Sequence, residues 1–138
     1  MTYYSLNKLA PNTTFKEAVI KGLAPDKGLY FPQSITPLPK AFFENIDDLS
    51  YTEIAFEAIR QFVTPDIPES VLKAIIAETL AFDFPVVQLN ENISTLELFH
   101  GPTMAFKDVG ARFMARCFGY FNQDKNAAKV TVLVATSG

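Results

Sequence analysis

The sequence predicts an α/β fold in which a mainly helical amino-terminal part is followed by the beginning of a parallel strand–helix–strand unit. Up to about residue 84, apolar residues recur at the spacing of short amphipathic helices separated by turns. From residue 85 onward, strand-like segments flank one helix within about forty residues, which is typical of a parallel crossover. We therefore divide the chain into a helical domain of residues 1–84 and the incomplete start of an α/β domain in residues 85–138.

The first segments are short and bounded by local signals. Asn12 or Thr13 is a suitable N-cap for a helix that carries apolar residues at helical spacing and ends at Gly22. A Pro-Asp-Lys-Gly turn at residues 25–28 leads into an apolar run at residues 29–31. We expect the proline-containing stretch after it to be irregular.

Two clearer helices follow. Ser50 and Glu53 have the spacing of a capping box, and Pro65 ends the helix that they open. A second helix runs from Pro68 or Glu69 to about Leu80. The residues expected to face the core are Ile54, Ala55, Ala58, Ile59 and Phe62 in the first helix, and Val71, Leu72, Ile75, Ile76 and Leu80 in the second.

The second region changes pattern. Residues 86–89 and 94–99 are strand-like, and residues 130–135 have the composition of a buried strand. Between them, Gly101-Pro102 marks a turn, Thr103 is a candidate N-cap, and a helix follows. Its predicted apolar stripe consists of Phe106, Val109, Phe113, Cys117 and Phe121.

Composition excludes several classes of function. A net charge of −3 and a pI near 5.1 argue against a nucleic-acid-binding surface. No apolar run approaches membrane-spanning length, and the amino terminus lacks the features of a secretory leader. One histidine and one cysteine give no metal-ligand spacing, and Cys117 fits a buried apolar role better than a reactive one. We expect a cytoplasmic protein without a metal site.

Lys107 is the most informative residue because it falls in or near the first turn of the predicted helix, where the helix dipole disfavours a cation. A lysine held there among Met104, Ala105 and Phe106 would lose its proton more easily and could act as a nucleophile toward a carbonyl group. The alternative is a solvated lysine whose aliphatic stem lies along the helix.

Residues 95–112, TLELFHGPTMAFKDVGAR, resemble the cofactor-lysine segment of the threonine synthase family, pyridoxal phosphate (PLP) enzymes with a tryptophan synthase beta-subunit-like fold. Residues 22–32, GLAPDKGLYFP, resemble the amino-terminal signature of this family, with Lys27 where glycine is usual. Residues 134–138 resemble the opening of its Ser-Gly-Asp-Thr-Gly loop. The likeness covers essentially the whole chain but only about the first third of a complete enzyme, so we expect an amino-terminal fragment.

The resemblance implies that Lys107 holds PLP as a Schiff base and moves protons at Cα and Cβ of the substrate. The reaction would convert O-phospho-L-homoserine and water to L-threonine and phosphate. Substrate-binding candidates are Thr136, Ser137, Gly138, His100 and Thr103. For His100 a turn residue satisfied by backbone groups is the alternative, and Arg112 fits a structural ion pair better than an anion ligand.

Two other functions remain open. A related PLP-dependent phospho-lyase would share the lysine segment, and a chain limited to these 138 residues could be a catalytically inactive folding or interaction module. The predicted strand at residues 130–135 would also present an apolar edge, for which we expect self-association.

Overall fold

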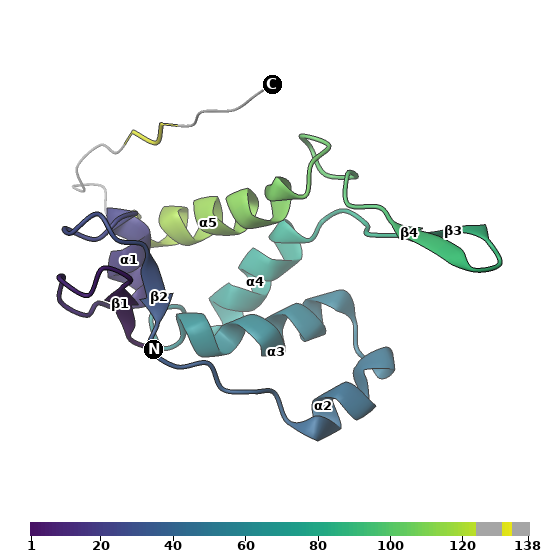
Figure 1. The fold of residues 1–138 in the computed structure, drawn as a ribbon, viewed down its shortest axis with the longest axis horizontal. Coiled ribbons are helices and arrows are strands. Elements are labelled where there is room, and N and C mark those ends of the chain that lie inside the picture. Colours follow the sequence, from purple (N-terminus) through teal and green to yellow (C-terminus); the bar gives the residue numbers. More distant parts are fainter. Residues whose placement is uncertain (124–130, 134–138) are drawn as a thin grey trace.

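The computed structural model describes residues 1–123 and 131–133, and Figure 1 shows a group of helices with one small sheet against it and one hairpin that projects away from it. In chain order the elements are β1 (Tyr3–Ser5), α1 (Phe15–Lys21), β2 (Tyr30–Pro32), α2 (Lys40–Glu44), the 3₁₀ helix η1 (Ile46–Asp48), α3 (Tyr51–Val63), α4 (Glu69–Thr79), β3 (Val86–Asn90), β4 (Ile93–Leu96) and α5 (Lys107–Phe121). The mixed α/β class predicted from the sequence is confirmed. The strand β1 and the two short helices α2 and η1 were not predicted.

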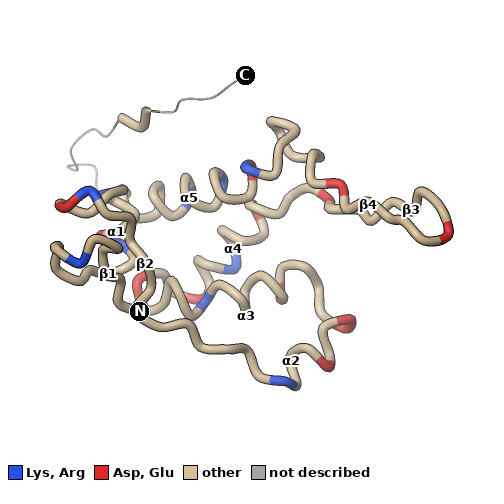
Figure 2. The backbone as a smooth tube through the Cα atoms, viewed as in Figure 1, with Lys and Arg blue, Asp and Glu red and all other residues tan. Residues whose placement is uncertain are grey.

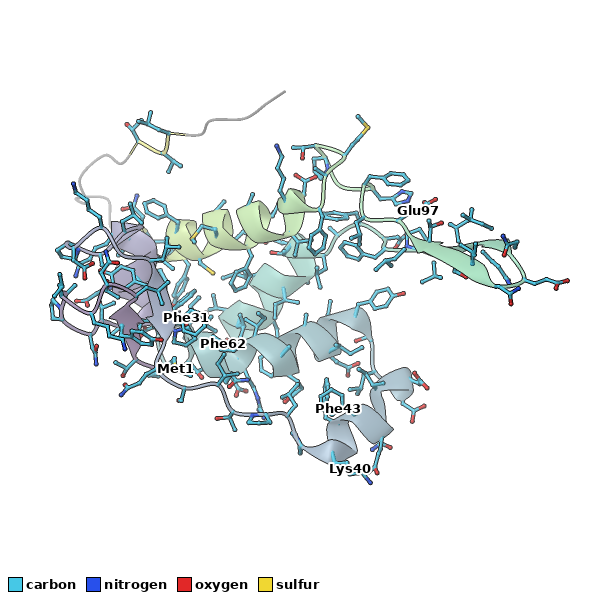
Figure 3. All side chains as sticks on the ribbon, viewed as in Figure 1. Met1, Phe31, Lys40, Phe43, Phe62 and Glu97 are labelled. Carbon is cyan, nitrogen blue, oxygen red and sulfur yellow. The ribbon has the colours of Figure 1, made fainter. Side chains whose placement is uncertain are left out.

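The small sheet is antiparallel and holds the amino terminus against α3. Strand β1 pairs with β2, so that Tyr3 lies opposite Pro32. The Tyr3 hydroxyl donates to the carbonyl of Phe62 at 2.8 Å, and the amino group of Met1 donates to the carbonyl of Thr64 at 3.1 Å. Met1 and Phe62 are labelled in Figure 3. These bonds join residues about sixty positions apart in the chain and close the fold around the end of α3.

The predicted turn at residues 25–28 is organised by one carboxylate. Asp26 accepts hydrogen bonds from the Ser5 hydroxyl at 2.6 and 2.7 Å and from the backbone N–H groups of Gly28 and Leu9 at 2.9 and 3.0 Å. The bond from Ser5, with smaller contributions from these N–H groups, lowers the pKa of Asp26 below 3.8. The family-like segment at residues 22–32 therefore contains a structural turn that anchors β2 to β1.

The helix boundaries follow local caps closely. The N-cap of α1 is Thr14, whose side chain accepts from the Glu17 N–H, and the expected cap at Asn12 or Thr13 was wrong because the Thr13 hydroxyl bonds to the Glu17 carboxylate instead. Gly22 ends α1 with φ of 70°, as predicted.

The predicted capping box at the start of α3 is confirmed. The Ser50 hydroxyl accepts from the Glu53 N–H at 3.3 Å, and the Glu53 carboxylate accepts from the Ser50 N–H at 2.8 Å. The predicted inward face of this helix was incomplete, because Phe56 and Val63 are its buried residues.

One hydrophobic core joins the helices α1, α3, α4 and α5. Its buried side chains are Val19, Phe56, Val63, Ile67, Leu72, Ile75, Ile76 and Cys117. Cys117 is completely buried, as predicted, and Phe113 and Phe121 pack beside it. Helix α5 lies against α4 and α1. The predicted domain boundary at residue 84 stays a prediction, and α5 shares its core with helices that precede that boundary.

The strands of the second region pair with each other. β3 and β4 form an antiparallel hairpin with Val86 opposite Leu96, and every residue of both strands is exposed. Residues 131–133, part of the third expected strand, are not in a strand, and the rest of it lies outside the described residues. The parallel crossover therefore stays a prediction, because the two strands that the structure describes before α5 pair locally through a short turn.

Replacing Gly28 by alanine should lower the free energy of unfolding by about 1–3 kcal/mol, because a Cβ atom there would overlap the Ser5 hydroxyl that binds Asp26. Urea unfolding monitored by circular dichroism measures this. Gly119→Ala is the matched control, since a Cβ at this exposed helix position meets no other atom within 4 Å, and it should stabilise by about 0.5–1 kcal/mol. Equal effects of the two changes would contradict the described turn.

The thiol of Cys117 should resist modification in the folded protein. Burial raises its pKa to about 11, and its side chain is 0% exposed. We expect no reaction with iodoacetamide at pH 8 without denaturant and complete reaction in urea, as measured by mass spectrometry. Rapid alkylation of folded protein would show that α5 does not pack as described.

Candidate functional site

Lys107 is the first residue of α5, at the junction between a loop of residues 97–106 and the helix. This confirms the predicted position in the first helical turn. Lys107 is exposed, and the neighbours expected to desolvate it do not bury it, because Met104 and Phe106 are 76% and 57% exposed. Two properties of Lys107 therefore matter for a reaction with a carbonyl group: its side chain is exposed, and it lies at the start of a helix.

A buried carboxylate organises the turn before Lys107. Asp108 is only 4% exposed, and it accepts hydrogen bonds from the Thr103 N–H and the Thr103 hydroxyl, both at 2.8 Å. Burial raises the pKa of Asp108, but these two bonds and the charges of Lys107 and Arg112 outweigh it, so the pKa is lowered overall. Asp108 is therefore an ionised, buried group beside the candidate lysine.

Thr103 is not the N-cap that the sequence predicted. Phe106 occupies that position without a side-chain cap, and the first bonds of the helix run from Asp108 and Val109 to Ala105 and Phe106 at 3.1 and 3.2 Å. The hydroxyl proton of Thr103 is engaged by Asp108, so it is not available to a substrate anion while this bond holds. The substrate-binding role of Thr103 stays a prediction.

His100 lies in the same loop and has a side-chain partner. Its Nε2 atom is 2.6 Å from the Glu97 carboxylate, and its ring stacks on Phe99 with centroids 4.8 Å apart. Glu97, labelled in Figure 3, follows β4 directly, and its N–H donates to Pro85 at 2.9 Å. The partner that the structure shows for the His100 ring is a side chain, that of Glu97 three residues earlier, and the choice between a turn role and a substrate role stays a prediction.

Two arginines fasten α5 to α4, and Figure 2 shows the basic residues of α5 in blue along the helix. Arg116 pairs with the Glu78 carboxylate at 2.7 Å, while Arg112 donates to the Glu78 carbonyl at 2.6 Å and lies over the Phe82 ring. Arg112 therefore has a structural role: it donates to a backbone carbonyl at the end of α4, and its charge also lowers the pKa of Asp108.

The remaining candidates, Thr136, Ser137 and Gly138, lie outside the described residues, so their proximity to Lys107 stays a prediction. Across the part of the chain that the structure describes, no three acidic, histidine or cysteine side chains are grouped so as to hold a metal ion. None of the helices described there has the length and apolarity needed to span a membrane.

Sequence reasoning missed Asp108 and Gly101 as parts of this site. Gly101 is buried against Asp108, and a Cβ atom on Gly101 would overlap the Asp108 carboxylate. An aspartate in a first helical turn is common because it suits the helix dipole, so its presence carried no further signal. Gly101, Thr103 and Asp108 come into contact only in the folded turn, so their spacing in the sequence did not indicate these contacts.

Comparison with known proteins gives a consistent result. A family model described as "Threonine synthase N terminus" matches residues 2–80. The chain is 37% identical to a threonine synthase of Buchnera aphidicola and 34% identical to that of Escherichia coli, over 100% of this chain and 32% of either relative. The chain thus spans about a third of the length of these relatives.

Solved structures agree with this. The PLP-bound threonine synthase of Brucella melitensis matches with a TM-score of 0.81 and 36% identity, over 88% of this chain and 27% of that chain. The threonine synthase of Escherichia coli matches with a TM-score of 0.83 and 32% identity, over 91% of this chain and 29% of that chain. Given the family match, the full coverage of this chain and the common fold, the chain belongs to the threonine synthase family.

Proposed function

We propose that the full-length protein is a PLP-dependent lyase that converts O-phospho-L-homoserine and water to L-threonine and inorganic phosphate, and that Lys107 is its cofactor lysine. Membership of the threonine synthase family is the observation that carries this proposal. The exposed position of Lys107 at the start of α5 supports the choice of residue. We expect the reaction to take place in the cytoplasm.

The residues at the site fit a covalently held aldehyde cofactor. An amine that condenses with an aldehyde must be reachable, and Lys107 is exposed at the end of a loop whose turn is held by Asp108 and Thr103. Lys107 is the residue that would hold the cofactor, through its side-chain amine. Bound PLP supplies an electron sink for negative charge that develops on the substrate carbons.

Lys107 has a second proposed task as an acid and base toward the substrate. Its amine would take a proton from Cα and return one at Cβ. Thr136 and Ser137 are proposed to hold the substrate carboxylate with their hydroxyl and backbone N–H groups, together with the backbone of Gly138. His100, stacked on Phe99 and bonded to Glu97, is proposed to face the substrate phosphate.

Lys107→Ala in the full-length protein should abolish the adduct that borohydride traps at this position after addition of PLP. It should also lower the rate of threonine formation by about a hundredfold to ten-thousandfold, because the same amine holds the cofactor and acts as the base. Peptide mass mapping and an assay of threonine and phosphate measure the two effects. Lys40→Ala is the control, since the side chain of Lys40 is 88% exposed and pairs with Glu44.

An adduct that persists at full yield in the Lys107→Ala protein would contradict the proposal. Turnover of other phosphorylated amino compounds with no turnover of O-phosphohomoserine would favour a related phospho-lyase. A full-length wild-type protein that forms no adduct at Lys107 would favour an inactive folding or interaction module.

A further inference from the structure

Asp108 is buried in the candidate site, and its carboxylate bonds to Thr103 in the loop that precedes α5. Both of its oxygens are bound by one residue, because the Thr103 N–H donates to Oδ2 and the Thr103 hydroxyl donates to Oδ1. Charge-assisted bonds of this kind are stronger than bonds between neutral groups. They offset the cost of removing the carboxylate from water and bind residues 103 and 108 into one unit.

The backbone of the loop is shaped around this carboxylate. Gly101 lies so close to Asp108 that a Cβ atom on Gly101 would overlap the carboxylate, and the Gly101 carbonyl accepts from the Met104 N–H at 2.9 Å. Met104 has φ of 53°, a left-handed conformation that is unfavourable for a residue with a side chain. Met104 is exposed, so its own side chain does not hold it there, and the bonds to Asp108 act together with the Met104–Gly101 backbone bond to keep the turn in this shape.

Lys107 is adjacent to Asp108 in the first helical turn, where side chains on neighbouring residues point about 100° apart. With Asp108 fixed inward, Lys107 lies on a different, exposed side of α5. A helix end without such a contact frays within its first turn.

We propose that Asp108 is a positioning residue for Lys107: through Thr103 and the close contact with Gly101 it fixes the turn at residues 101–104 and so holds the lysine amine where an aldehyde can reach it. This inference rests on the proposed role of Lys107. It assigns to Asp108 and Thr103 no contact with cofactor or substrate.

Variants of the full-length protein test it. Each is mixed with PLP, adduct formation is followed by absorbance, and the adduct is mapped after borohydride reduction. Asp108→Ala removes both bonds and should form the Lys107 adduct about tenfold to a hundredfold more slowly, since small displacements of a reacting group have effects of this size. Thr103→Val removes one bond and should act in the same direction. The two changes together should have less than the product of their separate effects, because they break the same contact.

Asp108→Asn is the conservative variant. Its amide oxygen can accept from the Thr103 N–H, and its NH₂ group can donate to the Thr103 hydroxyl oxygen, so it should restore the rate to within about threefold of wild type. Asp47→Ala, which removes an exposed carboxylate in η1, should have no effect. Hydrogen exchange of the Thr103 and Met104 amides gives a readout that does not involve PLP, and it should accelerate in Asp108→Ala but not in Asp108→Asn.

The outcomes separate this inference from the proposed function. A wild-type protein that forms no adduct at Lys107 refutes the proposed function, while the amide exchange still tests the turn. If the wild-type protein forms the adduct and the Asp108→Ala and Thr103→Val proteins form it at the wild-type rate, the positioning role is overturned and the proposed function stands. If Asp108→Ala fails to fold, Thr103→Val and Asp108→Asn decide the question. Slower adduct formation in Thr103→Val together with a near wild-type rate in Asp108→Asn supports the positioning role. A wild-type rate in Thr103→Val together with slower adduct formation in Asp108→Asn overturns it.

Discussion

The packing of α5 across α1 and α4 is the constraint on which the position of the candidate site depends. Cys117 is completely buried between these helices, the Phe121 ring meets the Phe15 ring with centroids 6.1 Å apart, and Arg116 pairs with Glu78 at 2.7 Å. At a rise of about 1.5 Å per residue, Lys107 lies about 15 Å along the helix from Cys117. One end of α5 is therefore anchored in the core while the other carries an exposed lysine.

Two of the three family-like segments are organised by a buried or bonded carboxylate in a similar way. In each, the carboxylate accepts hydrogen bonds from one hydroxyl and from backbone N–H, and a glycine lies close to these groups. Asp26 does this with Ser5 and Gly28, and Asp108 does it with Thr103 and Gly101. The pKa of both carboxyl groups is lowered, because the folded protein presents hydrogen-bond donors to the ionised form. An ionised carboxylate thus replaces regular secondary structure as the organiser of each turn.

Local patterns predicted the helices well and the contacts of the site poorly. The capping box of Ser50 and Glu53 and the glycine end of α1 were predicted because their hydrogen bonds join residues within one turn. Thr103 was misplaced as an N-cap because its hydroxyl is equally suited to donate to a carboxylate five residues later. The stripe of α5 was also predicted to include Phe106, which is 57% exposed because it precedes the helix and lies beyond the reach of the core.

The sequence by itself determined the α/β class, the helices α1, α3, α4 and α5, the capping box of α3, the buried role of Cys117 and the place of Lys107 at a helix start, because each of these depends on spacing within a few turns of chain. The tertiary structure alone decided that Arg112 meets the carbonyl of Glu78 and that Arg116 pairs with the Glu78 carboxylate. These contacts depend on which surfaces the core brings together. Hydrophobic burial sets that arrangement, and because it is non-directional, a local sequence pattern does not specify which surfaces meet.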